Sequence, residues 1–511
     1  MGRNLQKLAL WAAPLTFIAV LFYWAIAKVL LLGFEQDWFA VIADAHFVRV
    51  VAFTVGQALL STLLCVGFGI PGAYLLYRKK FFGRSFVRAL IAVPFVLPTI
   101  VVAIAFQGLD NQLSPLIAIL LAHLFLNYSI VVRTVGGVWA KLDVGIENAA
   151  ELDGAGKWQT FRFITFPMLR GATTSAAVLV FLYCVTSFGI ILLLGAGKVS
   201  SIETEIYFSL TQFLDFKTAS AYALVQTVIT VLAFAISKRI GNGEAGIETG
   251  TEIETSSGLN RREWPVVVVS VIFVIGVLVL PILNLLAKFT WAGFQSLSGN
   301  GQRGLLNISV WQATGNSLRN IVIAAGLALL IGILVSWLLS RSKRSWLEIP
   351  FLLPIGISAV VLGFGYLLSI RAGWLTVPLV QALLATPLVI RIVHPALISL
   401  GTDYRDVAVT AGANGWQIWR LVEAPMLSSV LRSAAVFAAL VSLGEFGAAS
   451  LLSYGDQATL PVVLYQLIGR PGPENYSMAM AASALLIVAV FVISMSSALI
   501  QTRRRSSAFA E

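Results

Sequence analysis

Charged residues are scarce in this chain. Of its 511 residues only 12% are Asp, Glu, Lys or Arg, whereas about 25% is usual in a soluble globular domain. Hydrophobic residues make up 58% of the chain. This composition excludes an ordinary soluble protein and predicts one that crosses a membrane several times.

Cysteine, histidine and the common catalytic motifs are also scarce. Cys65 and Cys184 both lie inside apolar runs, which predicts buried thiols and not a disulfide or a metal pair. The Gly-Lys pairs at 156–157 and 197–198 lack the upstream glycine and the following Ser or Thr of a P-loop. We therefore expect no catalytic residue, no metal and no cofactor in this chain itself.

Apolar runs long enough to cross a bilayer occur twelve times. A helical crossing takes about 20 mostly apolar residues, because every backbone N–H and C=O must be bonded within the segment. The runs lie near 8–33, 50–77, 88–108, 114–135, 172–195, 219–237, 265–287, 314–340, 349–370, 374–392, 430–453 and 477–500. The chain is predicted to be an all-α polytopic membrane protein with about twelve transmembrane helices.

The basic residues predict the orientation of these spans. They gather before the first span and after the second, sixth, eighth and twelfth, as at 78–80 and 503–505. The opposite loops hold acids such as Glu203 and Glu205. By the positive-inside rule both termini are cytoplasmic. Topology thus explains the net charge of +11, and nucleic-acid binding is not expected.

The two halves of the chain are internal repeats. Several matched positions lie 258 residues apart: Arg133 and Arg391, Ser187-Phe188-Gly189 and Glu445-Phe446-Gly447, Tyr207 and Tyr465. Pro-Phe-x-Leu-Pro runs recur at 94–98 and 350–354. Six spans return the chain to its starting side, so the repeats are parallel. We predict a first repeat over 1–237, a flexible cytoplasmic linker over 238–263 and a second repeat over 264–511.

A polar segment is duplicated between the fourth and fifth spans of each half. The first loop, near 139–170, and the second loop, near 397–428, share small residues, then Gly, Trp-Gln and Pro at equal spacing. This order predicts a short helix, a tight turn and a second helix that leads into the membrane. A helix lying on the lipid headgroups needs only an apolar face, so it leaves the matched positions unexplained.

The two loops resemble the cytoplasmic EAA loop of binding-protein-dependent ABC importer permeases. That loop reads roughly E-A-A-x-x-x-G, nine further residues and I-x-L-P. Here Gly154 is followed after nine residues by Ile164, and Gly412 by Val422. The departures are Asn148 and Asp406 in place of Glu, and Phe166 and Ala424 in place of Leu. Both six-span halves fit the permease unit, so the resemblance covers nearly the whole chain.

The resemblance implies a type I importer permease in the bacterial inner membrane. Each loop would be a coupling helix that docks on a separate ATP-binding subunit. The implied partners are two copies of that subunit, which carry ATP and Mg²⁺, and an extracytoplasmic solute-binding protein. The implied interface residues are Asn148, Ala149, Ala150, Gly154, Trp158 and Pro167 in the first loop, and Asp406, Ala408, Gly412, Trp416 and Pro425 in the second.

The narrower resemblance is to fused two-half permeases that import thiamine or iron(III), with thiamine ahead. It rests on the residues at 120–123 with Asn127 and on the run at 460–469. Other small solutes stay open, because in such systems the external binding protein does most of the selection. The alternative from another class is an ion-coupled secondary carrier. Such carriers place ionisable residues along the pathway, and these are nearly absent from the spans here.

Three polar residues inside spans are candidates for a pathway or a gate: Glu445, His123 and Asn127. An ionisable residue within a bilayer is by default a functional candidate. Structural interpretations compete with this one. Glu445 can have a structural or gating role, His123 can be a hydrogen-bonded packing residue, and Asn127 can join two helices by a hydrogen bond.

Overall fold

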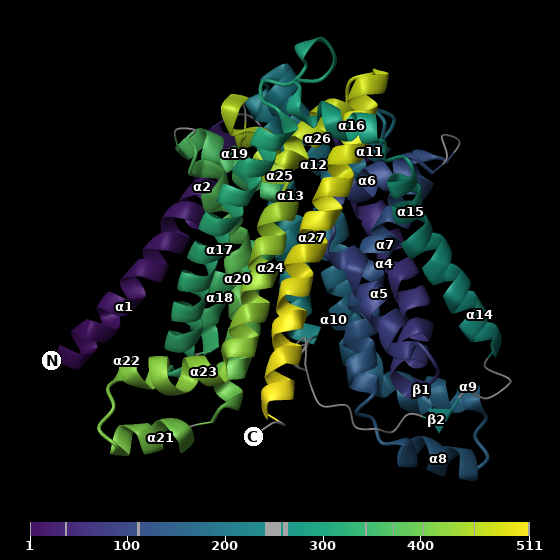
Figure 1. Cartoon of the computed structure of the whole chain (residues 1–511), viewed down its shortest axis with the longest axis vertical. Coiled ribbons are helices and arrows are strands. Elements are labelled where there is room, and N and C mark those ends of the chain that lie inside the picture. The colour runs from purple at the N-terminus through teal and green to yellow at the C-terminus, as the bar shows by residue number, and fades with distance from the viewer. Residues whose placement is uncertain are drawn as a thin grey trace.

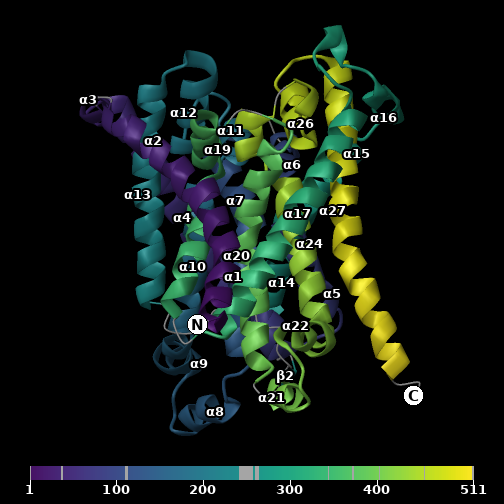
Figure 2. The same ribbon diagram turned by 90° about the vertical axis from the view of Figure 1, so that its left-hand side faces the viewer.

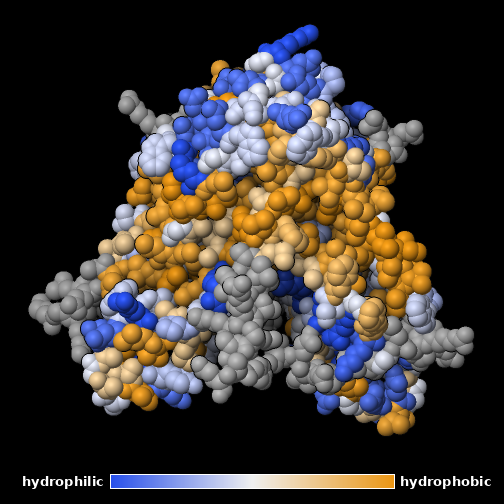
Figure 3. Space-filling model, viewed as in Figure 1, coloured by the Kyte–Doolittle hydropathy of each residue, from blue (hydrophilic) through white to orange (hydrophobic). Residues whose placement is uncertain are grey.

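The structure is a computed structural model. It describes residues 2–35, 38–109, 113–240, 257–258, 264–342, 345–370, 373–401, 403–453 and 455–508. This part of the chain is almost entirely helical, and its only strands, β1 (Lys79–Lys80) and β2 (Ser257–Gly258), pair in parallel. Long helices run between two polar ends, and an apolar band lies between those ends (Figures 1 and 3). Such a band is the surface that meets lipid.

The helices of the two halves follow the same order. The first half contains α1 (Gly2–Ile18), α2 (Trp24–Glu35), α3 (Trp38–Ile42), α4 (Ala45–Arg78), α5 (Arg84–Val96), α6 (Thr99–Gln107), α7 (Pro115–Trp139), α8 (Val144–Leu152), α9 (Lys157–Thr160), α10 (Phe166–Val185), α11 (Gly189–Leu194), α12 (Ile202–Phe208) and α13 (Phe216–Ile240). The second contains α14 (Trp264–Phe273), α15 (Leu280–Ala287), α16 (Trp291–Gln295), α17 (Val310–Ser340), α18 (Ile349–Leu352), α19 (Ala359–Ser369), α20 (Thr376–Ser399), α21 (Asp403–Thr410), α22 (Gly415–Ile418), α23 (Ala424–Met426), α24 (Ser428–Gly444), α25 (Gly447–Leu452), α26 (Leu460–Ile468) and α27 (Pro473–Ala508).

Eleven of the twelve expected spans are recovered among the described residues. Nine helices are long and apolar enough to cross a membrane, and two sharply bent helix pairs bring the number of spans to eleven. The remaining span, expected at 88–108, is divided into α5 and α6, with 13 and 9 residues. Each is too short to cross alone, so the expected run is a broken span.

The third span of each half is broken. Pro98 stands at the N-cap of α6, and in the second half the segments Trp346–Gly356 and Ala359–Ser369 are bent by 96°. In the first half proline explains the break, because it has no N–H to donate and disfavours helix in the residue before it, and Leu97 is extended. The fifth spans are also divided, at Thr186–Phe188 before α11 and at Glu445–Phe446 before α25. Hydropathy averaged over a window does not detect such breaks.

Small residues bring the helices of each half into close contact. A Cβ on Gly69 would lie 2.6 Å from Val131 Cγ1, and one on Gly332 would lie 2.6 Å from Val389 Cγ1. These contacts are equivalent in the two repeats and join α4 to α7 and α17 to α20. Close backbone approach of this kind is how helices associate in a membrane, where association depends on packing.

The first span of each half packs on the opposite half. α1 and α2 contact α17 and α19, whereas α14 and α15 contact α4 and α6. The approach is closest at Gly365, where a Cβ would lie 2.6 Å from the Ala25 carbonyl oxygen. The two repeats are therefore interlocked, which their sequence similarity alone does not predict.

The start of α1 and the end of α27 lie at the same end of the molecule as α8 and α21 (Figures 1 and 2). The linker predicted over 238–263 falls mostly outside the described residues. Its described strand β2 pairs with β1, directly after α4. The basic residues at 78–80 thus lie at this end as well, which is the cytoplasmic end by the positive-inside rule.

Candidate functional site

The first and second loops form the same helix–turn–helix at the cytoplasmic end (Figure 1). At the end of α8, Gly154 has φ +91° and the Ala155 N–H donates to the Ala150 carbonyl at 3.0 Å. At the end of α21, Gly412 has φ +83° and Ala413 makes the equivalent bond at 3.0 Å. This helix ending requires one residue in the left-handed backbone conformation, which glycine adopts without strain. The matched glycines are thus explained by backbone geometry.

The matched Trp-Gln pair begins the second helix of each loop. The side-chain oxygens of Gln159 and Gln417 accept hydrogen bonds from the backbone N–H three residues earlier, at 2.9 and 2.8 Å. Glutamine at this position caps the start of a helix. Trp158 and Trp416, in contrast, are 68% and 67% exposed. Each glutamine therefore serves the fold, and each tryptophan leaves a large apolar surface free for contact.

The predicted interface residues lie at the surface. No residue of α8 or α21 is buried. Ala150 and Ala408 are half-buried, and the other nine are exposed: Asn148, Ala149, Gly154, Trp158, Pro167, Asp406, Gly412, Trp416 and Pro425. Sequence reasoning missed Leu152 and Val407, whose exposure of 89% and 69% adds to the apolar surface. Contiguous exposed apolar side chains indicate a contact surface for another protein.

An arginine anchors the first loop to the second span of its half. Arg78, the last residue of α4, forms an ion pair with Glu147 on α8 and donates to the Leu142 carbonyl at 3.1 Å. Glu147 also accepts a hydrogen bond from the Thr165 hydroxyl at 2.7 Å. Arg78 is only 6% exposed. The short helix α8 is thus held directly by the end of a long span.

The second loop is anchored by the equivalent arginine but at another point. Arg341, directly after α17, donates to both carboxylate oxygens of Glu423, at 2.9 and 3.1 Å. Glu423 stands at the position of Thr165, and Arg405 at the position of Glu147. Burial lowers the pKa of Arg341, and the adjacent Glu423 carboxylate counteracts that effect. The acid has moved from the short helix to the segment that enters the membrane.

Four aromatic rings meet between the halves and form what we call the axial aromatic cluster: Phe188, Phe446, Tyr207 and Tyr465. The two phenylalanine rings stack with centroids 5.3 Å apart, and the two tyrosine rings meet edge to face at 6.3 Å. Each phenylalanine also contacts the tyrosine of its own half, at 5.3 and 5.7 Å. Because equivalent residues touch one another, the cluster lies on the axis that relates the two halves.

The broken spans place these rings. Phe188 and Phe446 are the N-cap residues of α11 and α25, and the tyrosines come from α12 and α26. These four helices lie at the end of the molecule away from α8 and α21 (Figure 1). A Cβ on Gly189 would lie 3.0 Å from Thr99 Oγ1 and 3.2 Å from the Phe446 ring. A side chain there would therefore push the halves apart.

Glu445 lies at the break beside the axial aromatic cluster. Its carboxylate accepts hydrogen bonds from the Ala448 and Ala449 N–H groups, at 2.6 and 3.1 Å, and so caps α25. The equivalent residue in the first half is Ser187, whose buried hydroxyl has no hydrogen-bond partner in the part of the chain that the structure describes. The two halves thus place different polar groups at the same point of the axis.

His123 and Asn127 lie in the packing of the first half. His123 Nδ1 is 3.0 Å from the Ser61 hydroxyl on α4, and the Asn127 amide donates to Cys184 Sγ on α10 at 3.6 Å. The hydrogen bonds of these two residues therefore join α4, α7 and α10. The side-chain hydrogen bonds of Glu445 go to α25 instead. The Asn127 amide also donates to the His123 carbonyl at 3.0 Å, so these two candidates are joined to each other, whereas no hydrogen bond among the described residues joins either of them to Glu445.

The position that we predicted for Glu203 from the sequence is wrong. We expected it in an outer loop, but it lies on α12 and is 1% exposed. Its carboxylate accepts hydrogen bonds from the Ser358 hydroxyl at 2.5 Å and from the Gln226 amide at 3.2 Å. It precedes Tyr207 by one helical turn, so both project from the same face of α12. A second buried acid thus lies on α12 one helical turn from Tyr207, a member of the axial aromatic cluster.

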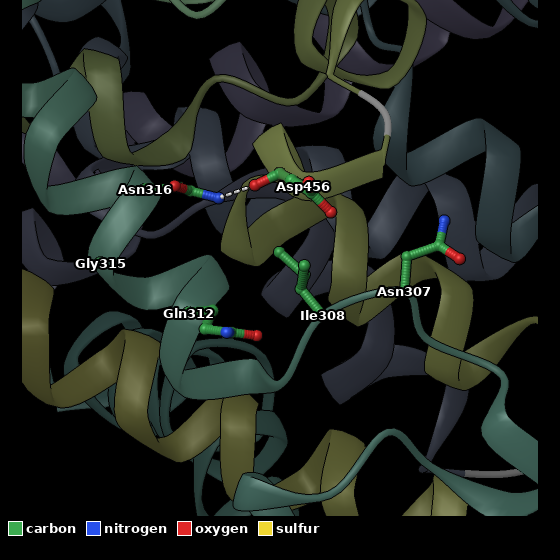
Figure 4. A pocket seen from close by; sticks show the side chains of 6 residues that line it. All are labelled: Asn307, Ile308, Gln312, Gly315, Asn316 and Asp456. Carbon is green, nitrogen blue, oxygen red and sulfur yellow. Dashed lines mark hydrogen bonds between the residues drawn. The ribbon is translucent and has the colours of Figure 1, made fainter.

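A polar hollow of about 510 Å³ opens at the outer end of the second half (Figure 4). The Asn316 side chain donates to the Asp456 carbonyl at 2.8 Å and ties α17 to the segment before α26. The hollow is lined by Asn307, Ile308, Gln312, Gly315, Asn316 and Asp456. It offers amide and carboxylate groups for hydrogen bonds from outside the membrane.

Known proteins resemble this chain both in part and over most of its length. Residues 65–242 match the family of binding-protein-dependent transport system inner membrane components. The chain is 28% identical to the thiamine transport system permease proteins of Haemophilus influenzae, over 93% of each chain, and of Escherichia coli, over 90% of each. It is 30% identical to a probable sulfate transport system permease protein of Chlorella vulgaris, over 87% of that protein and 40% of this chain.

Proposed function

Because the chain belongs to the family of binding-protein-dependent inner membrane transport components, we propose that it is the permease of a thiamine importer. It is a multi-pass protein of the bacterial inner membrane, and its family works with an ATP-binding subunit and a solute-binding protein. The observation that carries the choice of thiamine is the similarity to thiamine permeases over nine-tenths of both chains. A relative that matches only one half would not support it.

Two ATP-binding subunits dock on the cytoplasmic end, one on each loop. The support is that α8 and α21 occupy equivalent places in the two repeats and carry the exposed Trp158 and Trp416 beside them. ATP and Mg²⁺ belong to those subunits, and this chain contributes no catalytic residue. The interface residues proposed are the eleven named for the two loops.

Movement passes from the loops to the spans through the arginine anchors. When ATP draws the two subunits together, α8 and α21 are pulled toward each other. Arg78 then transmits the displacement to α4, and Arg341 transmits it to α17. Since α4 and α17 pack on α7 and α20, each half moves as a body and the space between the halves opens or closes.

Reconstitution tests this function. The chain is placed in vesicles with its ATP-binding subunit and its binding protein, and uptake of labelled thiamine is measured with and without ATP. We expect ATP-dependent thiamine uptake and no uptake of labelled iron(III). ATP-dependent import of iron(III) without thiamine would reject the substrate. Uptake by the chain alone, driven by a proton or sodium gradient, would place it among secondary carriers.

A further inference from the structure

We propose that the axial aromatic cluster is the outer gate of the transport pathway and the place where a planar aromatic cation binds as it passes. This inference rests on the proposed function, because it assigns a recognition site to the solute that the permease moves. It concerns four rings, two acids and one hydroxyl that come from both halves. None of these groups belongs to the cytoplasmic loops.

The position of the cluster supports the gate. In transporters built from repeats, the pathway lies at the interface between the repeats. Phe188 and Phe446 stack on each other at that interface and are 5% and 2% exposed. A solute that follows the axis has to part these rings. The helices that carry the cluster, α11, α12, α25 and α26, lie near the outer end (Figure 1), so the stacked and buried phenylalanines block the axis on that side.

The rings also suit one class of solute. The faces of aromatic rings attract cations, and cages of several rings bind organic cations. Tyr207 and Tyr465 are half-buried, so they form the accessible part of the cluster, with the buried phenylalanines behind them. When the Phe188 and Phe446 rings separate, each loses its stacking partner. A flat cationic ring that enters between them can stack on both. The cluster therefore favours a planar aromatic cation over a small hydrated metal ion.

Two buried acids complement that charge. Glu445 is next to Phe446, and Glu203 lies one turn before Tyr207. Within the described residues neither acid forms an ion pair with a lysine, arginine or histidine. A cation that arrives beside a buried carboxyl favours the charged form of that carboxyl and gains a counter-ion, whereas an anion gains none.

The first half adds an unused hydrogen-bonding group. Ser187 is 7% exposed, and its hydroxyl has no partner in the described part of the chain. An unpaired buried hydroxyl is costly unless a ligand or water completes it. Its place at the break, equivalent to that of Glu445, puts this donor at the axis. Thiamine has the matching groups, a thiazolium cation and an aminopyrimidine ring.

A leak experiment separates the gate from the binding protein and the ATPase. The full chain alone is placed in vesicles loaded with thiamine or with its neutral isostere, in which thiophene replaces thiazolium. Efflux is compared with that from protein-free vesicles. We expect the wild type to be sealed and Phe188→Ala with Phe446→Ala to leak. The matched control is Phe289→Ala with Phe294→Ala, a ring pair with centroids 6.3 Å apart near α16, which we expect to stay sealed.

The same leak reports on recognition. In the leaking variant we expect thiamine to pass about fivefold faster than the neutral isostere, the size of a cation–π preference. Adding Tyr207→Leu and Tyr465→Leu should make the efflux rates of thiamine and the isostere equal. Adding Tyr207→Phe and Tyr465→Phe instead should keep the fivefold difference. A sealed alanine pair contradicts the gate. A leak with equal rates while the tyrosines are present contradicts the cation site.

A second variant covers the case in which the alanine pair does not reach the membrane. In this variant, Tyr207→Cys with Tyr465→Cys, the two new cysteines are bridged by a cleavable cross-linker that has two thiol-reactive groups. The native Cys65 and Cys184 are buried, so the reagent does not reach them. ATP-driven thiamine uptake should stop on bridging and return on cleavage. Uptake that is unaffected by bridging overturns the gate. If the wild-type complex imports no thiamine, the proposed function fails, and the efflux ratio still tests the cluster.

Discussion

The first and second loops have the same backbone, but the arginine that anchors each loop meets a different partner. Arg78 holds Glu147 on the short helix α8, whereas Arg341 holds Glu423 in the segment that enters the membrane. The glycine turns and glutamine caps match in both loops. The repeats have therefore kept the mechanical link between loop and span while its acidic partner changed position.

If two copies of one ATP-binding subunit dock as proposed, this difference makes the two loops unequal toward them. α8 is tied directly to the end of α4, while α21 carries Arg405 where α8 carries Glu147. A force on α21 has to pass through the π-helical segment Trp419–Glu423 before it reaches Arg341. We expect the first loop to transmit movement more stiffly than the second. The following variants test that inequality.

Breaking both turns has the largest expected effect. Gly154→Pro with Gly412→Pro places proline where φ is +91° and +83°, although proline requires about −65°. Each change costs about 3 kcal/mol locally, and we expect the ATP-binding subunit to be lost while membrane insertion is kept. Co-purification of the subunit measures this. Gly154→Asn with Gly412→Asn is the control, because Asn tolerates the left-handed region. Normal subunit recovery with the proline pair would falsify the docking role.

Removing one anchor should uncouple transport from hydrolysis, and more strongly in the first half. Arg78→Ala removes an ion pair and a hydrogen bond to the Leu142 carbonyl, which together are worth about 1.5 kcal/mol or more. We expect thiamine uptake per ATP to fall about tenfold. Arg341→Ala should have a smaller effect, because α21 is not the element it holds. Equal losses in the two variants would mean that the loops are mechanically equivalent.

Moving the acid should convert one loop into the other. Glu147→Arg alone puts two cations together beside α4, and we expect poor coupling. Combined with Thr165→Glu, it reproduces the arrangement of Arg341, Arg405 and Glu423 in the second half. Uptake per ATP should then recover to within about threefold of wild type, since the loops share one backbone. A double variant as poor as the single one would show that the anchor depends on more than these positions.

The sequence predicts local geometry well and long-range packing poorly. The turn at Gly154 and the capping Gln159 follow from residue type and spacing, because both act within a few residues. The burial of Glu203 depends on Ser358, which is 155 residues away in the other half. The packing of each half's first span on the opposite half likewise depends on distant contacts, such as that of Gly365 with Ala25. Repeat spacing paired Phe188 with Phe446 correctly, but only the structure shows that they touch.

The helix caps should show the smallest difference between the loops. In the second loop Asn414 and Gln417 cap each other reciprocally, so Gln417→Ala leaves the Asn414 side chain bonded to the backbone N–H of residue 417. In the first loop Gly156 has no side chain, and Gln159→Ala removes the whole cap. Loss of a cap lowers the stability of the helix by about 1 kcal/mol. We therefore expect faster amide exchange at the start of α9 in Gln159→Ala than at the start of α22 in Gln417→Ala. The opposite order would show that packing of the loops, and not capping, holds these helices.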